Sequence, residues 1–242
     1  SVTSPATPKI DRTNNSEQII IDQPTPGNVT ITVSGYHVPV GPQEYFLVYD
    51  LIPNDLVITS PAKDDRFLPG ERIQIAWESY GVDSDYTIEF FDGSTWTTLQ
   101  AALQTDTHVH FWNIPSQVRT HGAKIRITRN ADQKTYTSEE FTVLGKPVIS
   151  IPSAQQCEGL IKMNWTAVNG ATEYEVMMLQ GDEMKTVDTV PSGHTSYYFT
   201  GLSPDSTYWV TVRALMDGKP GRRANALSRR PNTGACNEVI SK

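Results

Sequence analysis

Apolar and polar residues alternate with a period of two in short runs along most of the chain, as in TITVSG and KIRITRN. Pro, Gly, Asn and Asp interrupt these runs roughly every ten residues, as turn residues do between strands. The spacing of three and four positions that marks an amphipathic helix is nearly absent. The pattern therefore predicts an all-β protein built from short strands.

Residues 1–52 contain three strand-like runs, at 19–21, 29–35 and 45–51, with turns rich in Pro and Gly between them. Three strands cannot bury two sheet faces, and small isolated sheets are marginal in water. We therefore expect these strands to need an apolar partner, which would be either a separate chain or a symmetry-related copy of this one.

Residues 53–145 include the run ERIQIAWES, in which Ile73, Ile75 and Trp77 fall on one face of the predicted strand. A large aromatic residue at such a position is typical of a sandwich core. About seven strands are expected over this range, which is an immunoglobulin-like number. The range is therefore predicted to form a β-sandwich.

The turns and strands of this second unit follow an order that is found in a known type of module. Asp92 and Gly93 predict a hairpin turn before the next strand. The order of a TSP opening, an LPGE turn, an I-x-W strand and a D-G-S-T-W hairpin resembles a bacterial extracellular immunoglobulin-like module over residues 56–143. This resemblance implies an immunoglobulin-like sandwich.

Residues 146–236 form the third predicted unit, followed by a tail at 237–242. Trp165 and Tyr174 lie in two successive predicted strands, each placed to face inward. The later LSPDSTYWVTV, with Tyr208 at its centre, resembles the tyrosine corner of fibronectin type III domains. The resemblance implies that the Tyr208 hydroxyl bonds back to the preceding loop in a fibronectin-like β-sandwich.

The chain has two cysteines, Cys157 and Cys236. In a cytosolic protein they would be buried single thiols, whereas in an exported protein an even number suggests a bridge. C-x-G-x-I-x-M-x-W, with a closing T-G-A-C, resembles the cysteine-paired fibronectin domain of large secreted proteins from Bacteroidetes-type bacteria. The resemblance implies a Cys157–Cys236 disulfide and a secreted or cell-surface location.

The first segment carries a more specific resemblance. NNSEQIIIDQPTPGNVTITVSG, followed by VPVGPQEYFLV, resembles the last strands of the jelly-roll domain that follows the catalytic domain in secreted bacterial subtilisin-like serine peptidases. The resemblance implies that residues 1–52 end a domain that begins upstream. The expected partner is accordingly the upstream peptidase and jelly-roll fragment of the same precursor.

Charge excludes one class of partner. The chain has 20 Lys and Arg against 27 Asp and Glu, a formal net charge of −7, and no strongly basic segment. We therefore expect no nucleic acid partner. Late basic residues do cluster, and we interpret them as a solvated sheet face without a role: Arg222, Arg223, Arg229 and Arg230. No apolar run reaches the length of a membrane span, so none is expected.

The histidines do not suggest catalysis. A Ser-His-Asp hydrolase needs a nucleophile, a base and an orienting carboxylate, and His37 and His194 lie in loops without such neighbours. His108 and His110, together with His121, are the best candidates for metal ligands. Without a convincing third ligand, we favour solvent-facing positions for the pair. No catalytic residue and no resident metal are therefore expected.

Two pairs of turn aspartates leave calcium open as a cofactor. Asp83 with Asp85, and Asp64 with Asp65, could ligate the ion through side-chain and backbone oxygens. Aspartates in such loops are ordinarily turn formers, and we favour that interpretation. No cofactor is therefore expected, with calcium as the alternative.

The remaining tryptophans are contact candidates. Trp96 follows a hairpin turn, Trp112 ends a strand, and Trp209 must face away from the core because Tyr208 faces inward. We favour a contact with the neighbouring domain for Trp209 over a ligand contact.

Two functions remain open. The chain is either a non-catalytic spacer or substrate-docking region of a secreted subtilisin-like serine peptidase, or a cell-surface adhesion array that binds a protein or glycan ligand. The resemblance of the first segment favours the first. In both cases this chain alone is expected not to be an enzyme.

Overall fold

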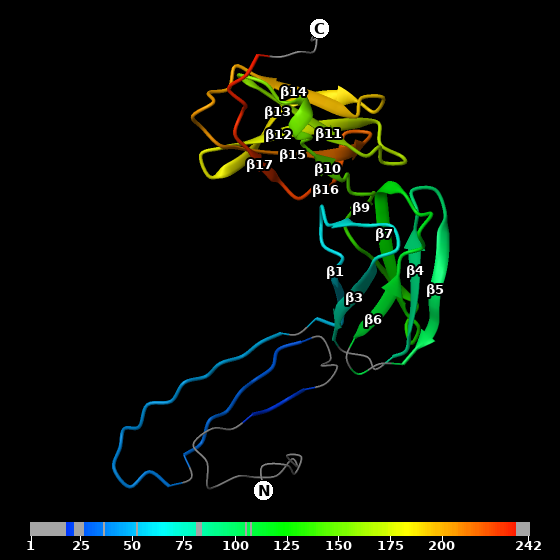
Figure 1. Ribbon diagram of the computed structural model, residues 1–242. Coiled ribbons are helices and arrows are strands. Elements are labelled where there is room, and N and C mark those ends of the chain that lie inside the picture. The colour runs from blue at the N-terminus through cyan, green and yellow to red at the C-terminus, as the bar shows by residue number, and fades with distance from the viewer. Residues whose placement is uncertain are drawn as a thin grey trace, which may run out of the picture.

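The computed structural model describes residues 18–21, 27–35, 37–51, 53–80, 84–104, 106 and 108–235. Within these ranges the protein is all-β: its strands form four sheets, and its helical content is one short 3-10 turn. The sheets pack in pairs as two β-sandwiches joined end to end, with an extended segment leading away from the first of them (Figure 1). The predicted all-β sandwich class is confirmed.

The first sandwich comprises β1 to β9. One of its sheets has the strand order β1-β3-β6, and the other has the order β2-β9-β7-β4-β5, with β8 paired to β7. The strands are β1 (Leu56–Ser60), β2 (Arg66–Phe67), β3 (Arg72–Ser79), β4 (Tyr86–Phe91), β5 (Trp96–Leu103), β6 (Val109–Asn113), β7 (Thr120–Arg129), β8 (Lys134–Thr137) and β9 (Phe141–Val143).

The core of this sandwich follows from the alternation in sequence. Ile73, Ile75 and Trp77 of β3 are buried on one face, as predicted. Ile125 of β7 closes the core from the opposite sheet, and the Trp77 ring packs edge-on against Tyr86 at 5.1 Å between centroids. Alternating side chains from two sheets thus fill one shared interior.

The predicted hairpin turn at Asp92 and Gly93 is also confirmed. The Asp92 amide donates to the Thr95 carbonyl at 3.2 Å, and Gly93 has a φ of 103°, which favours glycine. The Asp92 carboxylate accepts bonds from the Thr95 and Ser94 amides, and these lower its pKa to about 2. The turn therefore connects β4 to β5 with locally satisfied groups.

The second sandwich comprises β10 to β17. One sheet has the order β10-β11-β14, and the other has the order β13-β12-β15-β16, with β17 paired to β15. The elements are β10 (Ile149–Ser150), η1 (Ser153–Gln155), β11 (Leu160–Trp165), β12 (Glu173–Gln180), β13 (Glu183–Pro191), β14 (Ser196–Thr200), β15 (Tyr208–Met216), β16 (Lys219–Arg223) and β17 (Leu227–Arg229).

Aromatic residues organise the second core. Trp165 and Tyr174 are buried with their ring centroids 5.5 Å apart, as their predicted inward positions require. The Tyr208 hydroxyl accepts a hydrogen bond from the Ser203 amide at 3.0 Å. This is the bond that the tyrosine-corner spacing predicts, and it ties the loop before β15 to that strand.

The segment before β1, here called the arm (described residues 18–51), differs from the prediction. The structure assigns no strand at 19–21, 29–35 or 45–51, and no hydrogen bond joins the arm's described residues to any other described residue. Phe46 and Val48 are 92% and 91% exposed. The strand prediction is therefore corrected: the alternation is present, but no second sheet covers it among the described residues.

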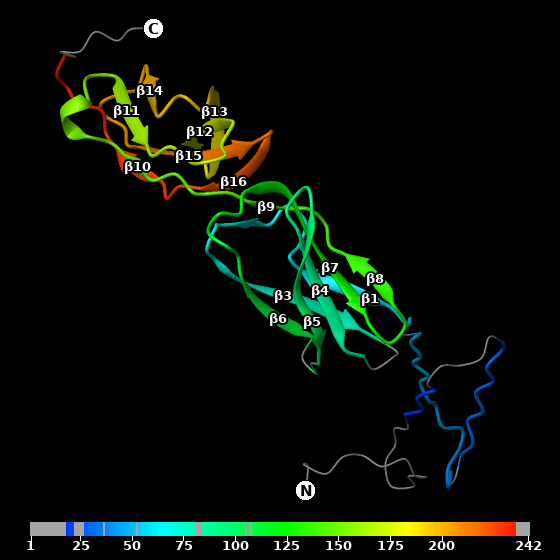
Figure 2. The same cartoon turned by 90° about the vertical axis from the view of Figure 1, so that its right-hand side faces the viewer.

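Figures 1 and 2 both show the arm running away from the first sandwich. We therefore expect Phe46→Ala to change the free energy of unfolding by less than about 0.5 kcal/mol, as exposed substitutions usually do. Phe199→Ala is the matched control, because Phe199 is only 4% exposed in the second core. Loss of this ring should cost about 3–5 kcal/mol. Urea unfolding of both variants measures the difference, and a cost above about 2 kcal/mol for Phe46→Ala would show that the arm packs on a sandwich in solution.

Candidate functional site

The junction between the sandwiches, formed by β2, β7 and β9 on one side and β16 on the other, brings together polar groups from both. The first sandwich continues directly into the second: β9 ends at Val143, which is buried in the first core, and the next residue, Leu144, is fully buried in the second. The Leu144 amide donates to the Phe67 carbonyl at 3.1 Å, so this residue contacts both sandwiches.

Arg222 of β16 reaches across the junction. Its Nε donates to the Arg66 carbonyl at 2.6 Å, and its Nη2 lies 2.8 Å from Glu71 Oε1. The second oxygen of Glu71 accepts the Leu68 amide at 2.8 Å, which orients the carboxylate toward the guanidinium. The earlier interpretation of Arg222 as a residue of a solvated face without a role is therefore corrected.

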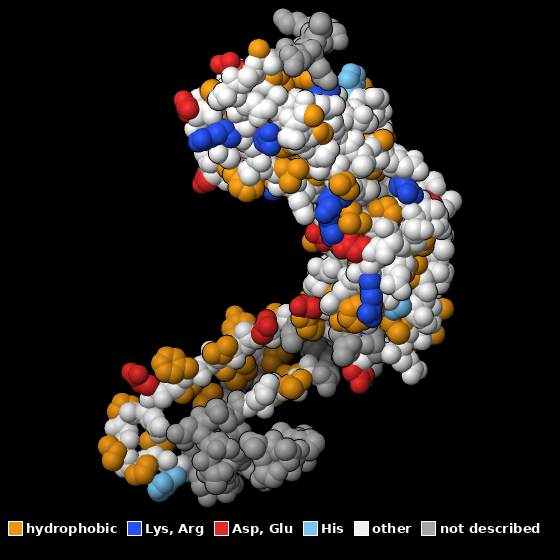
Figure 3. Space-filling view, in the orientation of Figure 1, with side chains coloured by type: hydrophobic (Ala, Val, Ile, Leu, Met, Phe, Trp, Pro, Cys, Tyr) orange, Lys and Arg blue, Asp and Glu red, His pale blue; other side chains and the backbone are white. Residues whose placement is uncertain are grey.

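A hollow of about 460 Å³ lies beside Arg222. Figure 3 shows basic and acidic side chains together on the concave side of the junction. The hollow has neither Ser, Cys nor His in its lining, so it offers charged and amide groups for binding rather than a nucleophile with its base. The lining residues are Asp64, Asp65, Arg66, Arg222, Arg223, Ala224, Asn225 and Ala226.

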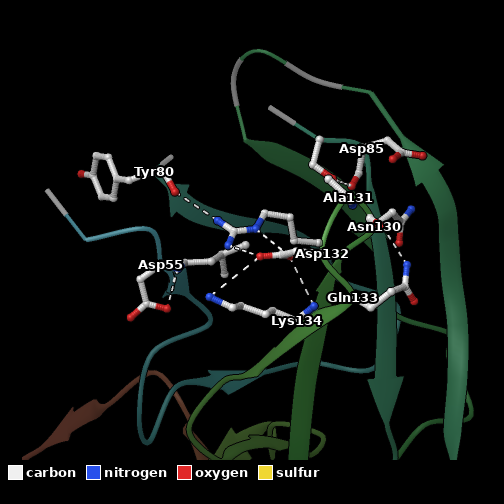
Figure 4. Close-up of polar contacts among 11 residues, drawn as sticks. Asp55, Tyr80, Asp85, Asn130, Ala131, Asp132, Gln133 and Lys134 are labelled. Carbon is white, nitrogen blue, oxygen red and sulfur yellow. Dashed lines mark hydrogen bonds and ion pairs between the residues drawn. The ribbon is translucent and has the colours of Figure 1, made fainter. Parts of the chain in front are cut away.

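A second polar cluster lies at the far end of the first sandwich (Figure 4). Arg129, at the end of β7, is completely buried. Its Nε and Nη2 donate to the two oxygens of Asp132 at 3.0 and 2.7 Å, and its Nη1 donates to the Tyr80 carbonyl at 3.0 Å. The hydrogen bonds from Arg129 lower the pKa of Asp132 to about 2. The cluster fixes the β7–β8 turn to the end of β3.

The candidate metal ligands do not converge. His108 faces the core edge, with Nε2 3.1 Å from the Tyr86 hydroxyl, so its predicted solvent-facing position is corrected. His110 is also half-buried rather than solvent-facing as predicted, and its burial lowers the pKa of the imidazole. His121 lies instead beside Asp217 of the second sandwich, at 3.3 Å. Within the described ranges, no three His, Cys, Asp or Glu side chains are grouped as metal ligands.

The structure describes three of the four aspartates considered as alternative calcium ligands. Asp65 Oδ2 accepts the Ala62 amide at 2.8 Å, and Asp64 adopts a left-handed φ of 62°, as turn residues do. Asp85 accepts the Asn130 amide through its own carbonyl at 3.0 Å. Asp83 lies outside the described residues, so calcium there stays the alternative to the expected role as a turn former.

The three contact tryptophans lie apart from one another. Trp96 stacks under Arg126, whose guanidinium carbon is 4.1 Å from a ring centroid, and Trp112 packs on Phe90 at 4.6 Å. Trp209 on β15 is 45% exposed, as the alternation around Tyr208 predicts. No tryptophan lines the hollow at the junction or the one beside Asn232 at the end of the second sandwich.

Comparison with known proteins identifies part of the chain. Residues 153–228 match the fibronectin type III domain family, so the chain contains a domain of that family. A search of curated proteins gave no match.

Three solved structures align with parts of this chain. The two-domain fibronectin type III segment of chicken tenascin is 17% identical, with a TM-score of 0.46, over 74% of this chain and 98% of that one. The FN1–FN3 domains of chicken CNTN1 are 14% identical, with a TM-score of 0.33, over 72% of this chain and 64% of that one. The fibronectin(III)-like modules of Clostridium thermocellum CbhA are 14% identical, with a TM-score of 0.29, over 78% of this chain and 99% of that one.

The Arg129–Asp132 pair predicts a pH dependence of stability. The folded-state pKa of Asp132 is about 2 against an ordinary value of 3.8, so the stability it contributes is present above 3.8 and is lost as pH falls through about 2. Asp132→Asn should therefore lower the free energy of unfolding at pH 7. The difference in free energy of unfolding between this variant and the wild type should become smaller between about pH 4 and pH 2.

Urea unfolding across this pH range measures the effect. Asp182→Asn, in the exposed β12–β13 turn, is the matched control and should follow the wild-type profile throughout. Parallel profiles for Asp132→Asn and wild type would show that the ion pair does not control the pH dependence.

Proposed function

We propose that this chain is the non-catalytic spacer or substrate-docking region of a secreted bacterial subtilisin-like serine peptidase. The observation that carries the proposal is the combination of two closely joined sandwiches with an uncovered apolar arm at one end. Fibronectin type III domains serve as accessory or spacer modules, which fits a non-catalytic role. Among the described residues no helix could cross a membrane.

The arm supports the connection to a peptidase. Its sequence resembles the last strands of a post-catalytic jelly-roll domain, and its described residues leave their backbone groups available for strand addition. Apolar side chains exposed in this way are an association hazard unless another sheet covers them. The proposed cover is the upstream jelly-roll part of the same precursor.

Trp209 keeps the second function open. Its exposed ring lies on β15 next to β17, where Leu227 is also 37% exposed, and aromatic side chains of this kind contact proteins and glycans. In the adhesion alternative, Trp209→Ala would abolish binding to a glycan or protein ligand, whereas Trp112→Ala would retain it.

A Cys157–Cys236 disulfide belongs to the same proposal of a secreted protein. Cys157 is buried, whereas Cys236 lies outside the described residues. The Glu158 amide donates to the Gly234 carbonyl at 2.8 Å, so the chain passes beside Cys157 two positions before Cys236. This proximity supports the pairing.

The pairing predicts that thiol labelling of the unfolded, unreduced protein detects no free thiol. Reduction should lower the free energy of unfolding by about 2–4 kcal/mol, because the bridge restricts the unfolded chain. Detection of two thiols per chain would contradict the disulfide.

The peptidase proposal is tested by hydrogen exchange on this chain and on the same protein expressed with the sequence that precedes Ser1 in its gene. We expect that sequence to encode a Ser-His-Asp peptidase, and the amides of 27–35 and 37–51 to exchange at least about tenfold more slowly in the longer protein. Peptides from β3 are the control and should exchange equally in both.

An upstream sequence without a peptidase would overturn the proposed function. A peptidase upstream, with arm exchange unchanged, would overturn only the docking of the arm.

A further inference from the structure

We propose that the two sandwiches move as one rigid body, because their junction is held at three separate places. Relative motion is the default expectation for neighbouring domains, so a rigid pair needs a specific cause. The proposal deepens the spacer role, on which its biological meaning rests: a rigid pair would hold whatever lies at its two ends at a constant angle. The contacts themselves do not depend on that role.

The first of the three contacts that hold the junction is made by Leu144, between the two sandwiches. The Leu144 side chain is fully buried in the second core, while its amide is bonded to Phe67 of β2. Rotation of one sandwich against the other would pull this side chain out of the core and expose its apolar surface. The fit is close, since a Cβ at Gly221 of β16 would lie 3.2 Å from two carbons of Leu144. Figures 1 and 2 both place β16 next to β9.

Arg222 provides the second point. One planar guanidinium donates to a backbone carbonyl, that of Arg66, and to the carboxylate of Glu71. Because the donors of this group are fixed in one plane, both bonds are satisfied only over a narrow range of orientations. The ion pair is only partly exposed, at 39% and 27% for the two side chains, so solvent screens it less than a surface pair.

The third point lies on β7. His121 Nε2 is 3.3 Å from Asp217 Oδ2, which belongs to the β15–β16 turn. Close by, a Cβ at Gly170 would lie 3.4 Å from Cδ of Arg119, so the loop before β12 rests on the residue preceding β7.

The three points fall on β2, on the end of β9 and on β7, which are consecutive strands of one sheet. The contacts therefore extend over three neighbouring strands rather than being confined to one. Opening of the junction at any one of these contacts is opposed by the other two. The hollow beside Arg222 has walls from both sandwiches and keeps a constant shape as a result.

The test is the measurement of backbone residual dipolar couplings in a weakly aligned sample of the whole chain. Couplings from both sandwiches of the wild type should fit one alignment tensor. The combined variant Glu71→Ala with Arg222→Ala, and separately Leu144→Ala, should each require a different tensor for each sandwich.

The matched control is Glu175→Ala with Arg213→Ala, an Arg–Glu pair that lies within the second sandwich. It should retain the single tensor. Unchanged amide shift patterns inside each sandwich establish that a variant is folded. If Leu144→Ala unfolds the second sandwich, the Glu71 and Arg222 variant alone decides.

Two results would overturn the proposal: separate tensors for the wild-type sandwiches, or one common tensor in the folded Glu71 and Arg222 variant. Both are independent of the arm, so a failure of the peptidase proposal and a failure of the rigid junction are distinguishable.

Discussion

Coverage of apolar strand faces by a second sheet is the physical condition on which the order of this chain depends. Ordering each residue costs conformational entropy, and apolar burial is the main term that offsets it. Ile75 and Ile125 satisfy the condition from opposite sheets and are fully buried. Phe46 has an equally suitable strand pattern around it, but no sheet among the described residues covers it, and it is exposed. The same pattern in sequence thus leads to two outcomes, separated only by the presence of a partner.

This difference explains what the sequence could predict. Trp77, Tyr174 and Tyr208 were placed correctly because inward and outward positions follow from a period of two and from a turn of fixed spacing. The arm strands were predicted by the same reasoning and did not form. A period of two indicates that a segment can form a strand with one buried face. It does not indicate whether a second sheet is present to bury that face.

The polar contacts at the two ends of the first sandwich could not be predicted for a different reason. Arg222 meets Glu71 across 151 positions, and Arg129 meets the Tyr80 carbonyl across 49. Nothing in the local sequence separates these arginines from Arg223 and Arg230, which are exposed. Only the arrangement of the sheets decides which basic side chain is paired. The cluster of late arginines therefore has the sequence pattern of a solvated face, although Arg222 pairs with Glu71 across the junction.

The two ends of the first sandwich therefore differ in kind. At the end next to β16, one apolar side chain enters the neighbouring core, and the Arg222–Glu71 ion pair and the His121–Asp217 contact also join the two sandwiches. At the end next to the arm, Arg129 and Asp132 close the sandwich internally and leave the arm without packing among the described residues. The contacts at the junction fix the orientation of the two sandwiches. The exposed apolar side chains of the arm, in contrast, can be buried only by another sheet. We therefore propose that the chain holds its own two sandwiches at a constant angle while its arm accepts a partner.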